Sequence, residues 1–131
     1  MFLTTALLSC LVLVTSQQSL VPFQATPADV VDRMLVLASV KKEDTVLDLG
    51  CGDGRIPIRA AEKYGARGIG VDIDPGLIEL AKANARTAGV ERLVEFRVED
   101  AVTTDVSKAT VVTLFLLPSF NAKLRPILTR G

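Results

Sequence analysis

The sequence contains no histidine and no tryptophan, and its charges balance. Without histidine, a histidine general base, a Ser-His-Asp triad and a histidine-ligated metal are excluded. Lys plus Arg and Asp plus Glu number 15 each, so no global field attracts nucleic acid or an anionic membrane, and no nucleic-acid partner is expected. The two cysteines, Cys10 and Cys51, are far apart in unlike surroundings, and neither a disulfide nor a metal site is expected.

The first 16 residues differ from the rest of the chain. Residues 2–14 are apolar and uncharged, but this run is shorter than the ~20 apolar residues of a membrane-spanning helix. No positive charge precedes Arg33, although the length suits a signal-peptide core. Residues 1–16 are therefore expected to be a signal peptide or a membrane anchor, with a buried apolar extension as the alternative. The expected localisation follows from this choice: a membrane-associated protein whose remaining domain lies in the cytoplasm, or export after cleavage.

Residues 17–25 are expected to be a linker, and residues 26–131 one α/β domain in which helices and strands alternate. The expected helices are 26–38, 54–64, 74–88 and 119–128, and the expected strands are 45–49, 68–72, 93–98 and 111–117. Thr26 is expected to cap the first helix, and Asp74 the third. The pattern predicts a Rossmann-like open parallel sheet with helices on both faces. Ligands of such sheets bind at the carboxyl ends of the strands.

Helical periodicity predicts the inner face of two of these helices. The first helix is expected to bury Val30, Val31, Met34, Leu37 and Ala38. The third is expected to bury Leu77, Leu80, Ala81, Asn84, Ala85 and Ala88.

The stretch T-V-L-D-L-G-C-G-D-G-R, residues 45–55, is the strongest functional signal. It predicts a buried strand, a tight glycine turn at Gly50, Gly52 and Gly54, and the start of a helix. Glycine permits a positive φ and a close approach of ligand to backbone. The N–H groups at the helix start are expected to face that ligand.

Acidic residues follow the first three expected strands. Asp72 lies roughly 20 residues after the glycine turn, where an acid accepts hydrogen bonds from ribose hydroxyls. Asp100 and the backbone of Ala101 and Val102 are candidates to read an adenine ring, and Ile73 is a candidate to pack on it. The alternatives are a helix-terminal acid for Asp72, a turn aspartate for Asp100 and ordinary core for Ile73.

Asp48 discriminates between two cofactor classes. A dinucleotide-binding loop has the spacing G-x-G-x-x-G and has no acid two residues before its first glycine. Here the spacing is G-x-G-x-G and Asp48 precedes it. An acid beside the ligand suits an amino group better than a pyrophosphate.

These motifs resemble those of the class I S-adenosylmethionine-dependent methyltransferases. V-L-D-L-G-C-G-D-G-R resembles their first motif, G-V-D-I-D at residues 70–74 their second, and V-E-D-A at residues 98–101 their third. T-P-A-D-V-V-D-R-M-L, G-C-G-D-G-R-I-P-I and V-T-L-F-L-L-P-S-F-N-A-K-L-R-P resemble bacterial relatives of mitochondrial protein-lysine methyltransferases that modify the adenine nucleotide carrier and the ATP synthase c-ring.

The resemblance implies S-adenosylmethionine as cofactor and methyl transfer to a protein lysine. It implies that Asp72 holds the ribose and Asp100 the adenine amino group. The implied contacts to the methionine part are Asp48, Gly50, Cys51, Gly52 and Gly54. The methyl acceptor is expected to be a protein or a small molecule, with membrane proteins among the candidates. The chain itself is expected to associate with a membrane through residues 2–14.

The catalytic residue stays unknown. Amino-methylating relatives often carry Asn/Asp-Pro-Pro-aromatic after the fourth strand, and this chain has Leu117, Pro118 and Ser119 there, which are weak candidates. A dinucleotide-binding oxidoreductase domain and a cofactor-binding fragment without turnover are the alternative functions. The family fold has three further strands, whereas this sequence ends just after the helix that follows the fourth expected strand. The sheet is therefore expected to stop there and to leave the apolar fourth strand as an open edge. A partial sequence is therefore expected.

Overall fold

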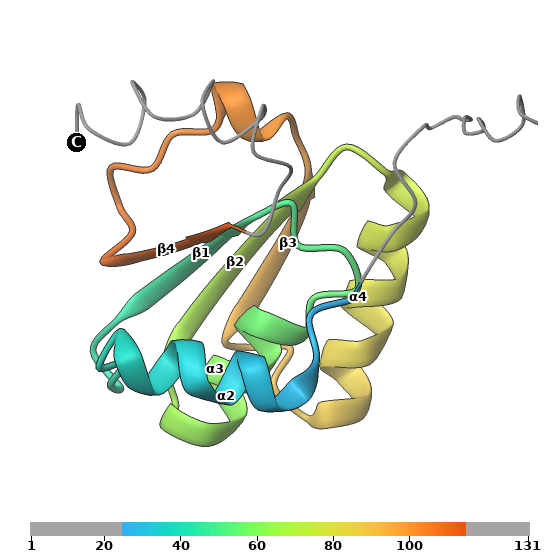
Figure 1. Ribbon diagram of the computed structural model, residues 1–131. Helices are drawn as coiled ribbons and strands as arrows, with labels where there is room; N and C mark the ends of the chain where they lie inside the picture. The colour runs from blue at the N-terminus through green and yellow to red at the C-terminus, as the bar shows by residue number, and fades with distance from the viewer. Residues whose placement is uncertain (1–24, 115–131) are drawn as a thin grey trace, which may run out of the picture.

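The computed structural model describes residues 25–114, which form one four-stranded parallel sheet with helices (Figure 1). In chain order the elements are α2 (Ala28–Leu37), β1 (Thr45–Leu49), α3 (Arg55–Tyr64), β2 (Arg67–Asp72), α4 (Pro75–Ala88), β3 (Val94–Val98), the 3-10 helix η2 (Ala101–Thr103) and β4 (Val111–Leu114). The predictions for residues 1–24, residues 115–117 and the helix at 119–128 lie outside the described residues, as do Leu117, Pro118 and Ser119.

The strand order is β3-β2-β1-β4, which confirms the predicted open parallel sheet. Two successive helical connections carry the chain from β1 to β2 and on to β3, and the next connection returns it to the other side of β1. The direction of winding therefore reverses between β1 and β4. In open α/β sheets such a reversal marks the crevice where ligands bind.

The two faces of the sheet are covered differently. Val46 of β1 packs with residues of α2 and α3, whereas Leu47 and Leu49 pack with Ala101 and the connection that follows it. Figure 1 shows α2, α3 and α4 on one side of the sheet and η2 with its connection on the other. Within residues 25–114, the second face is thus covered by a 3-10 helix and irregular chain rather than by an α-helix.

The ends of α4 agree with the sequence prediction. The carboxylate of Asp74 accepts hydrogen bonds from the N–H groups of Gly76 at 2.8 Å and Leu77 at 3.4 Å, and Pro75 occupies the first helical position. Gly89 ends the helix in the left-handed conformation, which L-residues adopt at a cost.

The prediction that Thr26 caps the first helix is wrong. The helix begins at Ala28, and Pro27 occupies the cap position without a side-chain hydrogen bond. Thr26 is buried, and its carbonyl accepts a hydrogen bond from the Arg55 guanidinium at 3.0 Å. The residue is therefore held against α3 rather than at the helix terminus.

The inner faces of two helices are also corrected. Helix α2 buries Val31 and Leu35, whereas Val30 and Leu37 are exposed. This helix is apolar on several sides, so periodicity alone does not choose its rotation. The packing of Val31 and Leu35 against β1 and α3 selects the rotation. A half-exposed ion pair between Arg59 of α3 and Asp32, with N–O distances of 2.7 and 3.2 Å, accompanies that packing.

In α4 the buried positions are Ile78, Ala81 and Ala85, whereas Leu80 is exposed. The predictions for Ala81 and Ala85 are therefore confirmed, and Ala88 packs partly buried against the same core. Ile78 is a buried residue that the prediction missed. The small alanines let α4 lie close to α3 and to Phe96 of β3.

Gly54 offers a test of this packing. It has φ of +84°, and a Cβ there would lie 2.7 Å from Phe96 Cζ and 2.9 Å from Ala81 Cβ. Gly54→Ala is therefore expected to lower the free energy of unfolding by about 2–5 kcal/mol, since left-handed strain and overpacking each cost about 1–3 kcal/mol. Urea unfolding followed by circular dichroism measures the loss.

Gly89→Ala is the matched control. Gly89 has a similar φ of +74°, but a Cβ there would meet nothing within 4 Å. Its loss should be limited to strain of about 1–2 kcal/mol. Equal losses for the two variants would contradict the packing argument.

Candidate functional site

The glycine turn after β1 has the predicted conformation. Gly50, Gly52 and Gly54 all have positive φ, at 82°, 56° and 84°. The N–H groups of Gly50 and Cys51 both donate to the carbonyl of Val71 at 2.9 Å. The N–H of Gly54 donates to the carbonyl of Cys51, also at 2.9 Å. The turn is thereby tied to the end of β2.

These hydrogen bonds occupy the N–H groups of the turn itself, whereas the expectation that the N–H groups of the first residues of α3 face the ligand stays a prediction. The N–H groups of Gly50, Cys51, Gly52 and Gly54 all donate within the fold, so they do not face a ligand. A pyrophosphate cradle uses such groups as its donors. The turn is instead a rigid backbone surface with an acid beside it, which argues against the dinucleotide-binding alternative.

Asp72 lies at the end of β2 and fixes two loops. Its Oδ2 accepts the N–H of Gly52 at 2.9 Å, and its Oδ1 accepts the N–H of Asp74 at 3.0 Å. Asp74 makes the capping hydrogen bonds of α4, and Asp72 reaches the helix start only through the N–H of Asp74. Each carboxylate oxygen has two lone pairs, and one on each oxygen stays available for a ribose hydroxyl.

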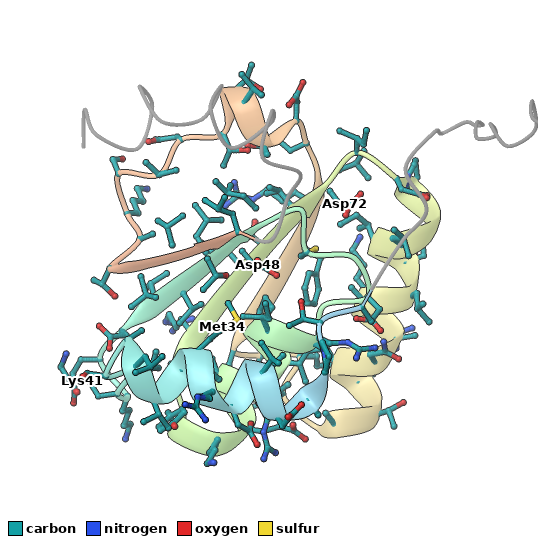
Figure 2. The ribbon with its side chains drawn as sticks, in the orientation of Figure 1. Met34, Lys41, Asp48 and Asp72 are labelled. Carbon is teal, nitrogen blue, oxygen red and sulfur yellow. The ribbon has the colours of Figure 1, made fainter. Side chains whose placement is uncertain are left out.

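Asp48 is the most buried acid of the site, with 3% of its surface exposed. Its Oδ1 accepts a hydrogen bond from the Thr113 hydroxyl of β4 at 2.8 Å. Burial, together with a smaller effect of the Asp72 charge, raises the pKa of Asp48 to about 7 against the opposing effect of the Thr113 hydrogen bond. Figure 2 shows Asp48 and Asp72 toward the same end of the sheet, with Lys41 at the other end.

Cys51 is buried beneath the turn, and its side chain packs against the strand behind it. A Cβ on Gly70 of β2 would lie 2.8 Å from Cys51 Cβ and Sγ, so the two residues fit only because Gly70 has no side chain. Burial raises the pKa of the Cys51 thiol, and the charges of Asp48 and Asp72 act in the same direction. The thiol is therefore neutral, and its place in the structure is that of a packing group.

Ile73 settles one of the open alternatives. Its side chain is 71% exposed, so it is not part of the core. It stands directly after Asp72 at the carboxyl edge of the sheet, where an apolar surface suits the face of an adenine ring.

Asp100 is a turn aspartate, as one of the two alternatives expected. Its Oδ1 accepts the N–H of Val102 at 2.9 Å and so starts η2. The Val102 N–H is therefore not a donor for an adenine ring nitrogen, and Ala101, which is buried, remains the backbone candidate. The Asp100 carboxylate is exposed, and its second oxygen remains available as an acceptor. That it binds an adenine amino group stays a prediction.

Sequence reasoning missed a second set of residues that hold the turn. Arg55 donates to both carboxylate oxygens of Asp53 at 3.1 and 2.7 Å and also to Thr26. Asn84 of α4 donates to the Asp53 carbonyl at 3.0 Å. The turn is thus tied to α4 and to the segment before α2. The only local signal in the sequence for these contacts is the G-D-G-R motif, because the partners lie 29 and 31 positions away.

Comparison with known families identifies the fold and chemistry. The ANTKMT methyltransferase domain matches residues 48–131, from Asp48 of β1 onward. The chain belongs to this methyltransferase family. A protein-lysine N-methyltransferase from Saccharolobus islandicus is 43% identical over 111 residues, which cover 84% of this chain and 69% of the relative.

Solved structures of methyltransferases agree with this assignment. An RNA methyltransferase from Salinibacter ruber in complex with S-adenosyl-L-homocysteine is 60% identical, has a TM-score of 0.81, and is matched over 82% of this chain and 70% of that one. A methyltransferase from Geobacter sulfurreducens, also with S-adenosyl-L-homocysteine, is 25% identical with a TM-score of 0.71 over 79% of this chain and 43% of its own. This methyltransferase therefore uses S-adenosylmethionine as its methyl donor.

The site residues fit that cofactor. Asp48 is a buried acid that suits an ammonium group, Asp72 has free lone pairs for a ribose, and Ile73 offers an exposed apolar surface. The positive-φ glycines leave the backbone of the turn open to close approach. The contacts of the individual residues remain predictions.

Proposed function

We propose that this methyltransferase transfers a methyl group from S-adenosylmethionine to a lysine amino group of a protein. The observation that carries the proposal is the 43% identity to a protein-lysine N-methyltransferase across 84% of the chain. Ribosomal protein L11 methyltransferases add support: that of Thermus thermophilus is 50% identical over 60 residues, although these cover only 45% of this chain and 23% of the relative.

RNA methylation is the second candidate, because the 60% identical Salinibacter ruber protein is described as an RNA methyltransferase. The charge of this chain favours the protein substrate. It carries no net charge, and several of its cations are paired with acids, among them Arg55, Arg59 and Arg97. Proteins that follow a phosphate backbone present clustered unpaired Lys and Arg.

Bound S-adenosylmethionine supplies an electrophilic methyl group on a positively charged sulfur. The chain's own task is to align the two reactants, and such alignment can supply roughly 7–11 kcal/mol of the barrier. A lysine nucleophile must also be neutral, which desolvation in a closed site favours. Neither task requires a histidine, so the composition suits this reaction. Backbone carbonyls near Leu117 and the Ser119 hydroxyl remain the predicted acceptors for the target nitrogen.

Membrane proteins are included among the proposed acceptors, because residues 2–14 form an apolar uncharged run. Among residues 25–114, no helix is both long enough and apolar enough to cross a bilayer.

Transfer of tritiated methyl groups to a cell extract tests the substrate class. The extract is separated into membrane and soluble fractions. After labelling, each fraction is digested either with protease or with ribonuclease. We expect the label to be released by protease, to resist ribonuclease, and to be recovered as methyl-lysine after acid hydrolysis.

Label released by ribonuclease would replace the protein substrate with RNA. No transfer to either material, with S-adenosylhomocysteine still bound, would favour the cofactor-binding protein without turnover. Asp72→Ala serves as the negative control, because it removes the predicted ribose contact and leaves the acceptor side unchanged.

A further inference from the structure

Two Thr-Asp hydrogen bonds join β1 to β4, one near each end of the strand pair. At the amino end, Thr110 donates to Asp44 Oδ1 at 2.8 Å. At the carboxyl end, Thr113 donates to Asp48 Oδ1, also at 2.8 Å, and the two residues are register partners. The pairs have the same chemistry, but only the second lies at the edge of the sheet where the cofactor binds.

The surroundings of the two acids differ. Asp44 accepts a further hydrogen bond from the Lys41 N–H at 2.8 Å, and the Lys41 ammonium lies 3.5 Å from it. Within residues 25–114, Thr113 provides the one hydrogen bond that the structure gives the Asp48 carboxylate. Both members of this pair are buried, at 3% and 8% exposed. A buried carboxylate oxygen without a donor is costly, which points to a ligand donor.

We infer that Thr113 is a positioning residue for cofactor binding: its hydroxyl holds Oδ1 of Asp48, so that Oδ2 faces the amino group of S-adenosylmethionine. The inference rests on the predicted place of the methionine part beside Asp48. Rotation of a free Asp48 carboxyl would present either oxygen in several directions. The bond from Thr113 removes that freedom and adds a donor to the ionised form.

The electrostatics of the site agree with this role. The groups that face Asp48 are the carboxylate of Asp72 on β2, the neutral Cys51 thiol of the turn and the Thr113 hydroxyl on β4. Burial and Asp72 raise the pKa of Asp48, and among these neighbours the Thr113 hydroxyl is the one that lowers it. Thr113 therefore favours the charged carboxylate that an ammonium ligand requires.

Thr113→Val tests the inference, because valine keeps the shape of threonine and lacks the hydroxyl. Calorimetric titration of the full chain with S-adenosylhomocysteine at pH 7 should show affinity reduced about tenfold or more, as expected for one charge-assisted hydrogen bond. The pH at which affinity reaches half its maximum should move up. Affinity for methylthioadenosine, which lacks the amino group, should change less than twofold.

The matched control is Thr110→Val, which removes the same hydrogen bond from the amino-end pair. It should lower the free energy of unfolding while S-adenosylhomocysteine affinity stays unchanged. In an Asp48→Asn background, Thr113→Val should have no further effect on that affinity. Thr113→Ser keeps the hydroxyl and should retain the wild-type pH profile even if the valine variant folds poorly.

Equal losses of affinity for S-adenosylhomocysteine and methylthioadenosine, or an unchanged affinity for both, would overturn the inference and leave Thr113 a structural residue. The measurement uses no methyl acceptor. Its result is therefore independent of whether the acceptor is a protein lysine or RNA.

Discussion

Asp72→Ala is expected to lower the affinity for S-adenosylhomocysteine at least a hundredfold. The predicted ribose contact supplies two hydrogen bonds to a charged oxygen, each contributing about 1.5–3 kcal/mol. The substitution also frees the N–H of Gly52, which donates to Asp72 at 2.9 Å, and so loosens the turn beside the cofactor. Calorimetric titration measures the combined effect.

A modified ligand separates the two causes. If Asp72 binds the ribose, the wild-type chain should prefer S-adenosylhomocysteine to its 2′-deoxy analogue by about tenfold or more, and Asp72→Ala should bind both alike. If Asp72 only holds the turn, the variant should keep the preference for the hydroxylated ligand. That second result would show that the ribose assignment is wrong.

Asp74→Ala is the control for damage to the nearby helix. Asp74 caps α4 through Gly76 and Leu77, so its loss should cost about 1 kcal/mol of stability. The affinity for S-adenosylhomocysteine should not change. A comparable loss of affinity in both variants would mean that Asp72 acts through the helix terminus.

The elements that the sequence predicted correctly are those with local causes. The glycine turn requires positive φ at Gly50, Gly52 and Gly54, and only glycine supplies it without strain. Asp74 with Pro75 marks a helix start through contacts within three residues. The parallel sheet follows from the alternation of helices and strands, because parallel neighbours need a crossover connection.

The features that could not be predicted depend on contacts between distant segments. Asp48 and Thr113 are 65 positions apart, and their pairing depends on the strand order and on the register of β4. The rotation of α2 similarly depends on another contact between distant segments, the packing of Val31 and Leu35 against β1 and α3. Periodicity describes one helix at a time, so it carried no information on either contact.

The cover of the second face of the sheet has a comparable explanation. The connection after β3 buries Ala101 and packs several apolar residues on Leu47 and Leu49 without forming an α-helix. Its sequence D-A-V-T-T-D-V-S-K-A-T is rich in Thr, Ser and Asp, which compete for backbone hydrogen bonds and favour turns. The alternation rule predicted the path of the chain but not the conformation along it.

Asp48→Asn is expected to stabilise the ligand-free chain while it weakens cofactor binding. The pKa of Asp48 rises from 3.8 to about 7 on folding, so the folded state disfavours the charged carboxylate. A shift of this size corresponds to about 4 kcal/mol at pH values above 7. The cost shrinks as the pH falls from 7 toward 4, because the folded chain takes up a proton there.

Urea unfolding at pH 5, 6.5 and 8 measures this dependence. Asp48→Asn should raise the free energy of unfolding by up to about 4 kcal/mol at pH 8, and by progressively less at the lower pH values. Asp44→Asn is the opposite control. The Lys41 N–H, the Thr110 hydroxyl and the Lys41 charge lower the pKa of Asp44, so removal of its charge should destabilise the fold at pH 8 and have less effect as the pH falls.

Cofactor binding should narrow the difference in stability between the two proteins. Saturation of the wild type at a hundred times its Kd adds about 2.7 kcal/mol of stability, and at the same ligand concentration Asp48→Asn should gain far less, because its neutral amide cannot pair with the amino group. A variant that is more stable alone and less stabilised by S-adenosylhomocysteine would show that Asp48 is an unfavourable buried charge until the ligand arrives. If Asp48→Asn and Asp44→Asn both destabilise the free chain, the buried acid is structural and the ammonium contact must be sought elsewhere.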